Sequence, residues 1–218
     1  MTKWFNINYH YTVPEFDNTK PRLLDNRWLR YWQEAKEELN INGKPVILGP
    51  VTLIKLGKLN GEYVSSPEDI NRLLDQILPL YGQVFQELQE AGVQWVQLDE
   101  PSLVKIDDDS AIAPYQRVTA YLHEIAPKLN VELQTYFDSL DTYQAVVDLP
   151  VQAVGLDFVH GNGENLKSVQ QYGFPEDKIL AAGIVDGHNI WTANLQEKLD
   201  LAKTLQSLAP NLWLQPSN

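Results

Sequence analysis

The chain contains 218 residues, of which 44% are hydrophobic and 21% charged, and its formal net charge at pH 7 is -12. These values are typical of one globular domain, and the negative charge argues against nucleic acid and anionic membranes as partners, because phosphate groups bind surplus Lys and Arg. The absence of cysteine excludes disulfides, thiolate zinc ligands and a cysteine nucleophile. No apolar run approaches the roughly 18 residues of a membrane span, so we expect a soluble, cytoplasmic protein.

The first segment of the chain is extended and alternates aromatic with polar residues between positions 4 and 14. A buried parallel strand is normally a run of Val, Ile and Leu, so this composition does not fit a central strand. We expect a hairpin or a long extension that lies over the top of a barrel.

The rest of the chain alternates short apolar runs with longer amphipathic runs, which predicts strands and helices in βαβ order. Strands are expected at residues 45–51, 93–98, 131–136, 152–157, 179–184 and 212–215. Helices are expected at residues 24–39, 66–88, 114–129, 140–148, 166–172 and 193–208. The second helix has Ser66 as its N-cap and Pro67 in its first turn, and Pro79 is expected to kink or split it.

Six parallel strands separated by helices predict an α/β fold of the (β/α)8 TIM-barrel type that is incomplete, because a closed barrel needs eight strands. We expect a single partial barrel over residues 1–218, with the hairpin-like segment added at its start. Six strands leave two open parallel edges. We expect a partner chain, a second copy of this chain, a helix or the opening extension to cover them.

Polar residues follow the predicted strands at their C-terminal ends, where ligands bind in barrel proteins. The candidates for a shared pocket are Asp99, Glu100, Asp157, His160, Asp186 and His188, with His10 from the opening segment. Each has an alternative interpretation as a helix cap or turn residue, since Asp-Gly and His-Gly pairs are common in turns. We expect no metal ligand set, because neither a His-x-x-x-His nor a Glu-x-x-His spacing occurs.

Five segments of the chain carry a family resemblance: KWFNINYHYTVPEF at 3–16, LGPVT at 48–52, QLDEP at 97–101, TYF at 135–137 and GIVDGHNIW at 183–191. In these segments the sequence resembles the N-terminal domain of cobalamin-independent methionine synthase. The resemblance implies a family that moves a methyl group from 5-methyltetrahydrofolate polyglutamate to homocysteine with zinc, using two similar barrels that face each other. It also implies that this chain is truncated at both ends, and that the zinc lies in the missing C-terminal barrel.

The resemblance further assigns individual residues. Gln134, Tyr136, Asp157 and Asn218 stand where the catalytic barrel carries its zinc ligands, so we expect no cofactor on this chain and no catalytic residue of its own. His188 matches a histidine that donates a proton in the catalytic barrel. Lys3 matches the lysine that contacts the glutamate tail of the folate. Four further cations either extend this patch or are ordinary surface residues: Lys20, Arg22, Lys55 and Lys58.

Three functional hypotheses follow. The leading one is a folate-binding and scaffold barrel for methionine biosynthesis, a weak binder of folyl-polyglutamate that is active as a methyltransferase only with the second barrel. The second is a stand-alone, metal-free acid–base enzyme that uses Asp99, Glu100 and His188. The third is a non-enzymatic domain that completes another polypeptide.

Overall fold

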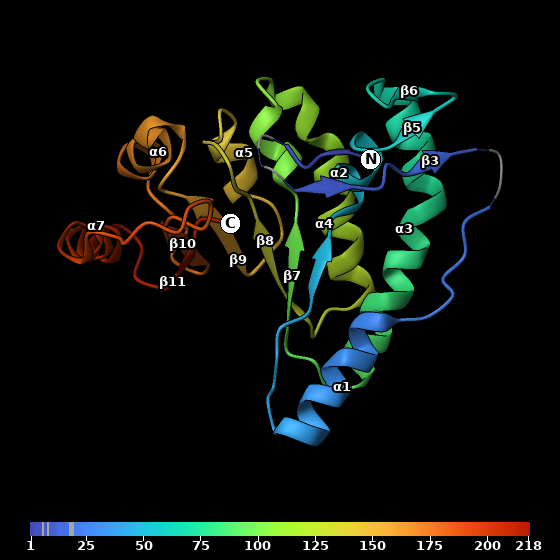
Figure 1. The fold of residues 1–218 in the computed structure, drawn as a ribbon, viewed down its shortest axis with the longest axis horizontal. Coiled ribbons are helices and arrows are strands. Elements are labelled where there is room, and N and C mark those ends of the chain that lie inside the picture. The colour runs from blue at the N-terminus through green and yellow to red at the C-terminus, as the bar shows by residue number, and fades with distance from the viewer. Residues whose placement is uncertain (6, 8, 18–19) are drawn as a thin grey trace. The chain divides into compact units, whose positions relative to one another are not determined.

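The computed structural model describes residues 1–5, 7, 9–17 and 20–218, and its strands and helices alternate along the chain (Figure 1). Asn6 and Asn8 of the expected N-terminal extension lie outside the described residues. The chain forms two compact units. Unit 1 is Met1–Glu100 with Ala113–Val131, and unit 2 is Pro101–Ile112 with Glu132–Asn218.

The start of unit 1 forms the expected hairpin-like extension. Strand β1 (Thr2–Lys3) pairs antiparallel with β2 (His10–Tyr11), which places Lys3 opposite His10. Next, β3 (Glu15–Phe16) runs parallel to β5 (Lys58–Leu59), and β5 pairs antiparallel with β6 (Glu62–Tyr63).

The remainder of unit 1 combines two parallel strands with four helices. The strands are β4 (Val46–Leu48) and β7 (Trp95–Asp99), and the helices are α1 (Arg27–Leu39), α2 (Pro50–Lys55), α3 (Pro67–Glu90) and α4 (Ala113–Ile125). Ser66 caps α3 as expected, because its side chain accepts the N–H of Asp69. Pro79 does not split α3, which continues as one helix. Helix α2, which was not expected from the sequence, begins with Pro50 shortly after β4.

The outer edge of β4 is covered by side chains. Residues Pro45 and Gly49 bond to β7, so the alternate carbonyls of Val46 and Leu48 face the other side of the strand. The Trp28 indole N–H donates to the Val46 carbonyl at 2.9 Å. The Tyr81 hydroxyl donates to the Leu48 carbonyl at 2.7 Å. Two helices, α1 and α3, therefore supply the cover that we expected for one open edge.

We predict that Tyr81→Phe lowers the free energy of unfolding by about 1–2 kcal/mol, because it leaves the Leu48 carbonyl without its donor. Burial and then the charge of Glu100 raise the pKa of Tyr81, so its hydroxyl keeps the proton it donates. Urea denaturation measures the change. Tyr31→Phe on the exposed face of α1 is the matched control, and equal stability of the two variants would contradict the prediction.

Unit 2 contains the other four parallel strands, in the order β8, β9, β10, β11. The strands are β8 (Asn130–Gln134, whose first two residues belong to unit 1), β9 (Ala153–Asp157), β10 (Ile179–Val185) and β11 (Leu212–Pro216). The helices are α5 (Tyr143–Val147), α6 (Glu164–Tyr172) and α7 (Leu195–Leu208), with short 3-10 turns η1 (Pro101–Lys105), η2 (Asp109–Ile112) and η3 (Gly161–Gly163). All residues of β9 are buried, so this strand forms the centre of the unit.

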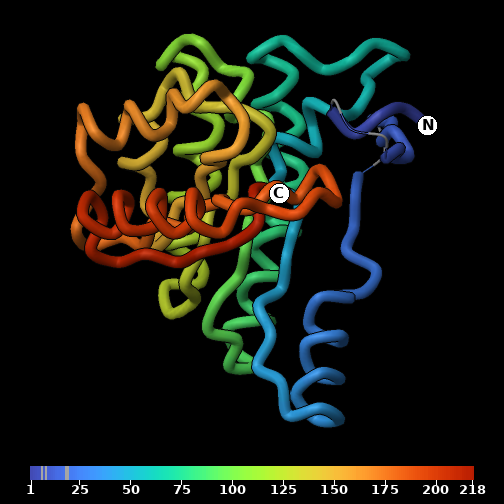
Figure 2. The backbone as a smooth tube through the Cα atoms, turned by 60° about the vertical axis from the view of Figure 1, so that its left-hand side comes forward, coloured from blue at the N-terminus to red at the C-terminus, as the bar shows by residue number. Residues whose placement is uncertain are grey.

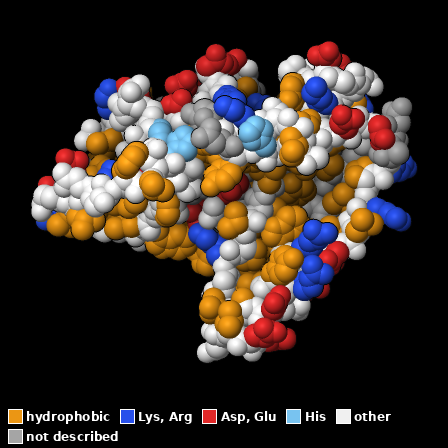
Figure 3. All heavy atoms as spheres, viewed as in Figure 1, with side chains coloured by type: hydrophobic (Ala, Val, Ile, Leu, Met, Phe, Trp, Pro, Cys, Tyr) orange, Lys and Arg blue, Asp and Glu red, His pale blue; other side chains and the backbone are white. Residues whose placement is uncertain are grey.

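The last elements of unit 2 carry several apolar side chains that are exposed to solvent. Helix α7 and the strand β11 that follows it run side by side (Figure 2). Within the described residues, no strand pairs with the outer side of β11. Hydrophobic side chains gather on this part of the surface (Figure 3). The exposed ones are Ile190, Trp191, Leu195, Leu199 and Leu214.

All six predicted strands are present within a few residues of their expected positions, and all six are parallel. The expected α/β class with six parallel strands is confirmed. That the two units together make a single barrel stays a prediction. In the described part of the chain, no helix combines the length and the apolar character needed to cross a membrane.

Candidate functional site

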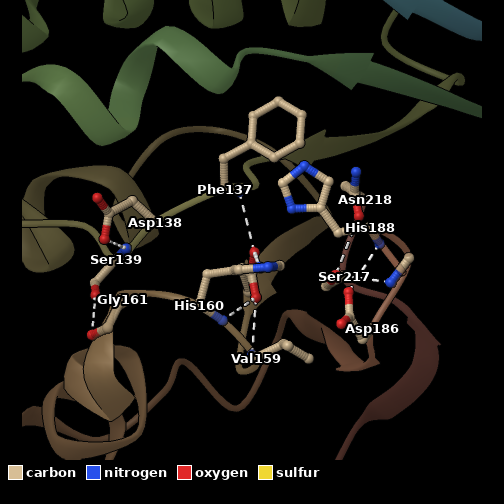
Figure 4. Close-up of polar contacts among 12 residues, drawn as sticks. Phe137, Asp138, Ser139, Val159, His160, Gly161, Asp186, His188, Ser217 and Asn218 are labelled. Carbon is tan, nitrogen blue, oxygen red and sulfur yellow. Dashed lines mark hydrogen bonds and ion pairs between the residues drawn. The ribbon is translucent and has the colours of Figure 1, made fainter. Parts of the chain in front are cut away.

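Four of the candidate residues lie at the C-terminal strand ends of unit 2, and Figure 4 labels three of them, His160, Asp186 and His188. Asp157 is the last residue of β9, and His160 lies three residues after it. Asp186 and His188 follow β10. The imidazole rings of His160 and His188 meet edge to face, with 5.3 Å between their centroids.

Asp157 connects the loops of this site through hydrogen bonds to its carboxylate. Its carboxylate is completely buried, and a buried charge is stable only when hydrogen bonds replace its hydration. Oδ1 accepts the backbone N–H groups of Val159 and His160 at 2.8 and 2.9 Å. Oδ2 accepts the backbone N–H of Phe137 at 3.0 Å and lies 2.8 Å from Nδ1 of His160. One side chain therefore fixes the loops after β8 and β9.

The contact with Asp157 also orients the His160 ring. A carboxylate can only accept hydrogen bonds, so the neutral His160 ring carries its proton on Nδ1. Its Nε2 then keeps a free lone pair. The side chain is 23% exposed, which leaves the ring accessible to a small ligand. An oriented imidazole of this kind can accept a proton or a hydrogen bond at Nε2.

Phe137 adds a strained position beside the histidines. Its φ is 80°, in the left-handed region that a bulky residue rarely adopts. Its ring centroid lies 5.7 Å from that of His188 and 4.6 Å from that of Tyr136. The hydrogen bond to Asp157 holds the backbone in this conformation. The sequence contains no signal for it, because nothing in the pattern marks a Phe for positive φ.

Asp186 is engaged in its own turn. Its carboxylate accepts the side-chain N–H of Asn189 at 2.9 Å and the backbone N–H of His188 at 2.8 Å. The bond from Asn189, assisted by the backbone bonds and by the nearby His160, holds the pKa of Asp186 below its usual value. Asp186 therefore acts as a turn residue, which was the alternative interpretation of the Asp-Gly pair. The same hydrogen bonds fix the position of His188.

Gln134 and Asp157, two of the four residues compared above with zinc ligands, have their polar atoms in hydrogen bonds. Gln134 accepts the side-chain N–H of Gln215 at 2.6 Å through Oε1 and donates to the Thr135 carbonyl through Nε2. Both oxygens of Asp157 are occupied by hydrogen-bond donors. Within the described residues, no group of three or more His, Cys, Asp or Glu side chains is placed to hold a metal ion.

Asp99 and Glu100 belong to unit 1, at the end of β7. Glu100 is only 1% exposed. Its carboxylate accepts the N–H of Val51 at 3.0 Å, the N–H of Thr52 at 2.8 Å and the hydroxyl of Thr52 at 2.6 Å. It therefore binds the first turn of α2. Asp99 is partly buried, and its Oδ1 accepts the side-chain N–H of Gln97 at 2.8 Å.

Burial raises the pKa of Glu100 to about 7, against the opposing effects of the bonds from Thr52 and Val51 and of the charge of Lys55. Gly49 makes room for this carboxylate, because a Cβ atom at position 49 would lie 2.1 Å from Cδ of Glu100. This contact was not expected from the sequence. The Gly-Pro pair before Val51 is the one signal that could have indicated a helix start there.

Lys3 and His10 lie opposite each other in the β1–β2 hairpin, and both are exposed. The hairpin is braced by Trp4, whose ring meets that of Tyr11 edge to face at 5.7 Å. Among the other candidate cations, the ammonium group of Lys58 lies 5.0 Å from the Tyr63 ring centroid. Lys3 therefore lies on a short strand that the Trp4–Tyr11 ring contact supports. Its side chain is exposed, so an anionic ligand can reach it.

Parallel strands that are followed by helices and carry polar side chains at their C-terminal ends define an α/β protein of the kind in which ligands bind beyond the strand ends. Residues 1–210 match the sequence model of the family described as "Cobalamin-independent synthase, N-terminal domain". The chain belongs to this family.

Relatives support the assignment over the whole chain. A protein of Lactiplantibacillus plantarum is 59% identical over 220 residues, which are 100% of this chain and 28% of that protein. A protein of Bacillus subtilis is 44% identical over 221 residues with the same coverage. Both are named 5-methyltetrahydropteroyltriglutamate–homocysteine methyltransferase. The chain thus spans 28% of the length of these curated relatives.

A solved structure has the same fold. The B12-independent methionine synthase from Shewanella sp. W3-18-1 superposes with a TM-score of 0.65 at 14% identity, covering 87% of this chain and 58% of that one. At this identity the likeness concerns the fold. It supports a TIM-barrel-type arrangement of strands and helices for the present chain.

Proposed function

We propose that this chain is the folate-binding and scaffold barrel of a cobalamin-independent methionine synthase. In this proposal it contributes to methyl transfer from 5-methyltetrahydrofolate polyglutamate to homocysteine, and a second, zinc-bearing barrel supplies the chemistry. The observation that carries the proposal is the match of residues 1–210 to the N-terminal domain of this family. The proposal includes a cytoplasmic location, as for a biosynthetic enzyme.

Two features of the chain support its dependence on a partner. It contains no cysteine, so it cannot offer a thiolate to zinc. Two of the side chains that the resemblance places at zinc-ligand positions already make hydrogen bonds, Gln134 to Gln215 and the Thr135 carbonyl, and Asp157 to the backbone N–H of Phe137. The exposed apolar side chains near β11 offer a contact surface, and we propose that the second barrel contributes to covering it.

Reconstitution tests the proposal. The chain is assayed for methionine formation from 5-methyltetrahydropteroyltriglutamate and homocysteine, alone and with the separately expressed C-terminal remainder of the L. plantarum relative. We expect no turnover by the chain alone and turnover by the mixture that exceeds that of the C-terminal part alone. Turnover by the chain alone, or no gain from adding it, would contradict the proposal. Size-exclusion chromatography of the chain alone tests the alternative that a second copy is the partner.

We predict that Lys3→Ala weakens the binding of 5-methyltetrahydropteroyltriglutamate about twofold to fivefold, because an exposed ion pair contributes up to roughly 1 kcal/mol. Isothermal titration measures the Kd. The monoglutamate form is the ligand control, because Lys3 is proposed to contact the tail and its removal then leaves this Kd unchanged. Lys128→Ala, an exposed lysine of the same unit, is the protein control. Equal triglutamate affinities of wild type and Lys3→Ala would remove Lys3 from the site.

A further inference from the structure

Three asparagines of the chain are followed directly by glycine, a pair that favours spontaneous loss of the side-chain nitrogen of asparagine. The pairs are Asn42-Gly43, Asn60-Gly61 and Asn162-Gly163. Glycine has no Cβ atom, so its backbone nitrogen can approach the carboxamide carbon of the preceding residue and close a five-membered ring. This ring closes only when the Cβ atom of asparagine and the next backbone nitrogen are eclipsed about the Cα–C bond. The backbone angles of each asparagine therefore decide how easily it reacts.

Two of the three pairs are held in ordered turns with left-handed backbone angles. Asn60 and Gly61 have φ of 52° and 89° and form the two-residue connection between β5 and β6, as in a type I′ hairpin turn. Asn162 has a φ of 54° and a ψ of 25°, and Gly163 has a φ of 76°. At positive φ the eclipsed arrangement falls in a region that residues other than glycine rarely adopt. Both asparagines must therefore leave their turns before the ring can close.

Asn42 lies in a connection that contains no such turn. Residues 40–45 join α1 to β4 without a helix or strand, and φ is positive neither at Asn42 nor at Gly43. The Asn42 side chain is exposed, and within the part of the chain that the structure describes it makes no hydrogen bond, nor does the Gly43 N–H. Gly43 borders a hollow of about 250 Å3 beside α1, and a Cβ atom built on it would meet nothing within 4 Å. The nitrogen and the carboxamide can therefore meet without breaking a contact.

We propose that Asn42 is a site of spontaneous modification, at which the chain loses ammonia and gains aspartate or isoaspartate. The backbone nitrogen of Gly43 attacks Cγ of Asn42 and forms a C–N bond, and the carboxamide nitrogen leaves as ammonia with the proton of the Gly43 N–H. Water, the co-reactant, then adds to one of the two ring carbonyls and opens the ring. Cleavage at Cγ gives aspartate. Cleavage at the backbone carbonyl carbon gives isoaspartate, in which the chain continues through the side chain.

The place of Asn42 in the fold gives this modification a structural effect. On one side, the N–H of Ile41 donates to the Ala35 carbonyl of α1 at 3.0 Å. On the other side, the Pro45 carbonyl accepts the N–H of Gln97 at 2.9 Å, where the pairing of β4 with β7 begins. Isoaspartate adds one carbon to the backbone between these two fixed points. Either product also adds a negative charge, so ion-exchange chromatography separates the modified chain from the unmodified one.

The test is peptide mapping by mass spectrometry of the folded chain after incubation at mildly alkaline pH. Trypsin separates the three pairs, because Lys58 and Arg72 lie between them in the sequence. We expect Asn42 to convert at least about threefold faster than Asn60 and Asn162, since these two must first open an ordered turn. In urea the turns are lost, and the difference is expected to disappear. Conversion of Asn60 or Asn162 as fast as that of Asn42 in the folded chain would overturn the proposal, and so would an order of rates that persists unchanged in urea.

Substitution of the glycine tests the reaction itself. In Gly43→Ala the new Cβ atom meets no neighbour and φ is not positive, so we expect the variant to fold, which circular dichroism checks. The methyl group crowds the attacking nitrogen, and we expect the conversion of Asn42 to slow at least about tenfold. Ile41→Val alters the other, exposed neighbour of Asn42 and is the matched control, which should keep the wild-type rate. Labelling by an isoaspartyl methyltransferase identifies the product. An unchanged rate in Gly43→Ala would overturn the assignment.

Discussion

Replacing Asp157 with alanine is expected to lower the free energy of unfolding by about 3–5 kcal/mol. The substitution removes the acceptor of three buried or partly buried backbone N–H groups and of the His160 ring. Each stranded donor costs roughly 1–3 kcal/mol, because nothing else in the loops replaces the carboxylate. Phe137 is also released from the hydrogen bond that holds its positive φ.

Urea denaturation followed by circular dichroism measures this loss. Asp157→Asn is the more conservative variant. Its amide oxygen can still accept the N–H groups of Val159 and His160, but its NH2 group then faces the N–H of Phe137 and Nδ1 of His160. We therefore expect an intermediate loss of the free energy of unfolding. Asp138→Ala is the matched control, because Asp138 is exposed in the same connection and accepts only the N–H of Ser139 among the hydrogen bonds of the described residues. Equal stability of the Asp157 and Asp138 variants would show that the carboxylate does not hold the loops.

The second large effect is a dependence of stability on pH through Glu100. The pKa of this carboxyl is raised from 4.5 to about 7 in the folded chain. Below pH 4.5 the group is neutral in both states and favours neither. Between pH 4.5 and 7 the unfolded chain ionises first, so the free energy of unfolding falls as pH rises. The loss is complete above pH 7 and amounts to about 3 kcal/mol.

Urea denaturation at a series of pH values tests this dependence, with wild type compared to Glu100→Gln. We expect the slope between pH 4.5 and 7 to be shallower in the variant, because glutamine does not titrate. Glu90→Gln, at the exposed end of α3, is the control and should keep the wild-type slope. Hydrogen exchange of the Val51 and Thr52 amides gives a local readout, since both donate to Glu100. A variant with an unchanged slope would assign the pH dependence to other groups.

The strands and long helices were predictable because each has a strong local signal. An apolar run such as that of β9 can be stable only when buried, and α3 begins with an N-cap and a proline at the positions that favour a helix start. Helix α2 was not predictable from periodicity, because its six residues are too few to show a repeat. Pro79 was expected to kink or split the helix, but α3 is not split, because packing of its apolar face maintains the element.

The closeness of three candidate side chains followed from their positions at strand ends, but their arrangement did not. Asp157, His160 and His188 lie together in unit 2, and their role as a ligand pocket stays a prediction. The sequence pattern could not tell that Glu100 turns inward to α2, because this depends on the space that Gly49 leaves in another part of the chain.

The covered edge of β4 has a consequence for how the molecule behaves at high concentration. Exposed strand edges are templates on which strands of other molecules add, and this is a common route to aggregation. The indole of Trp28 and the phenol of Tyr81 occupy the two outward carbonyls of β4, so an incoming strand must break both bonds before it can pair. Two side chains thereby act as gatekeepers against cross-β growth from this side of the sheet.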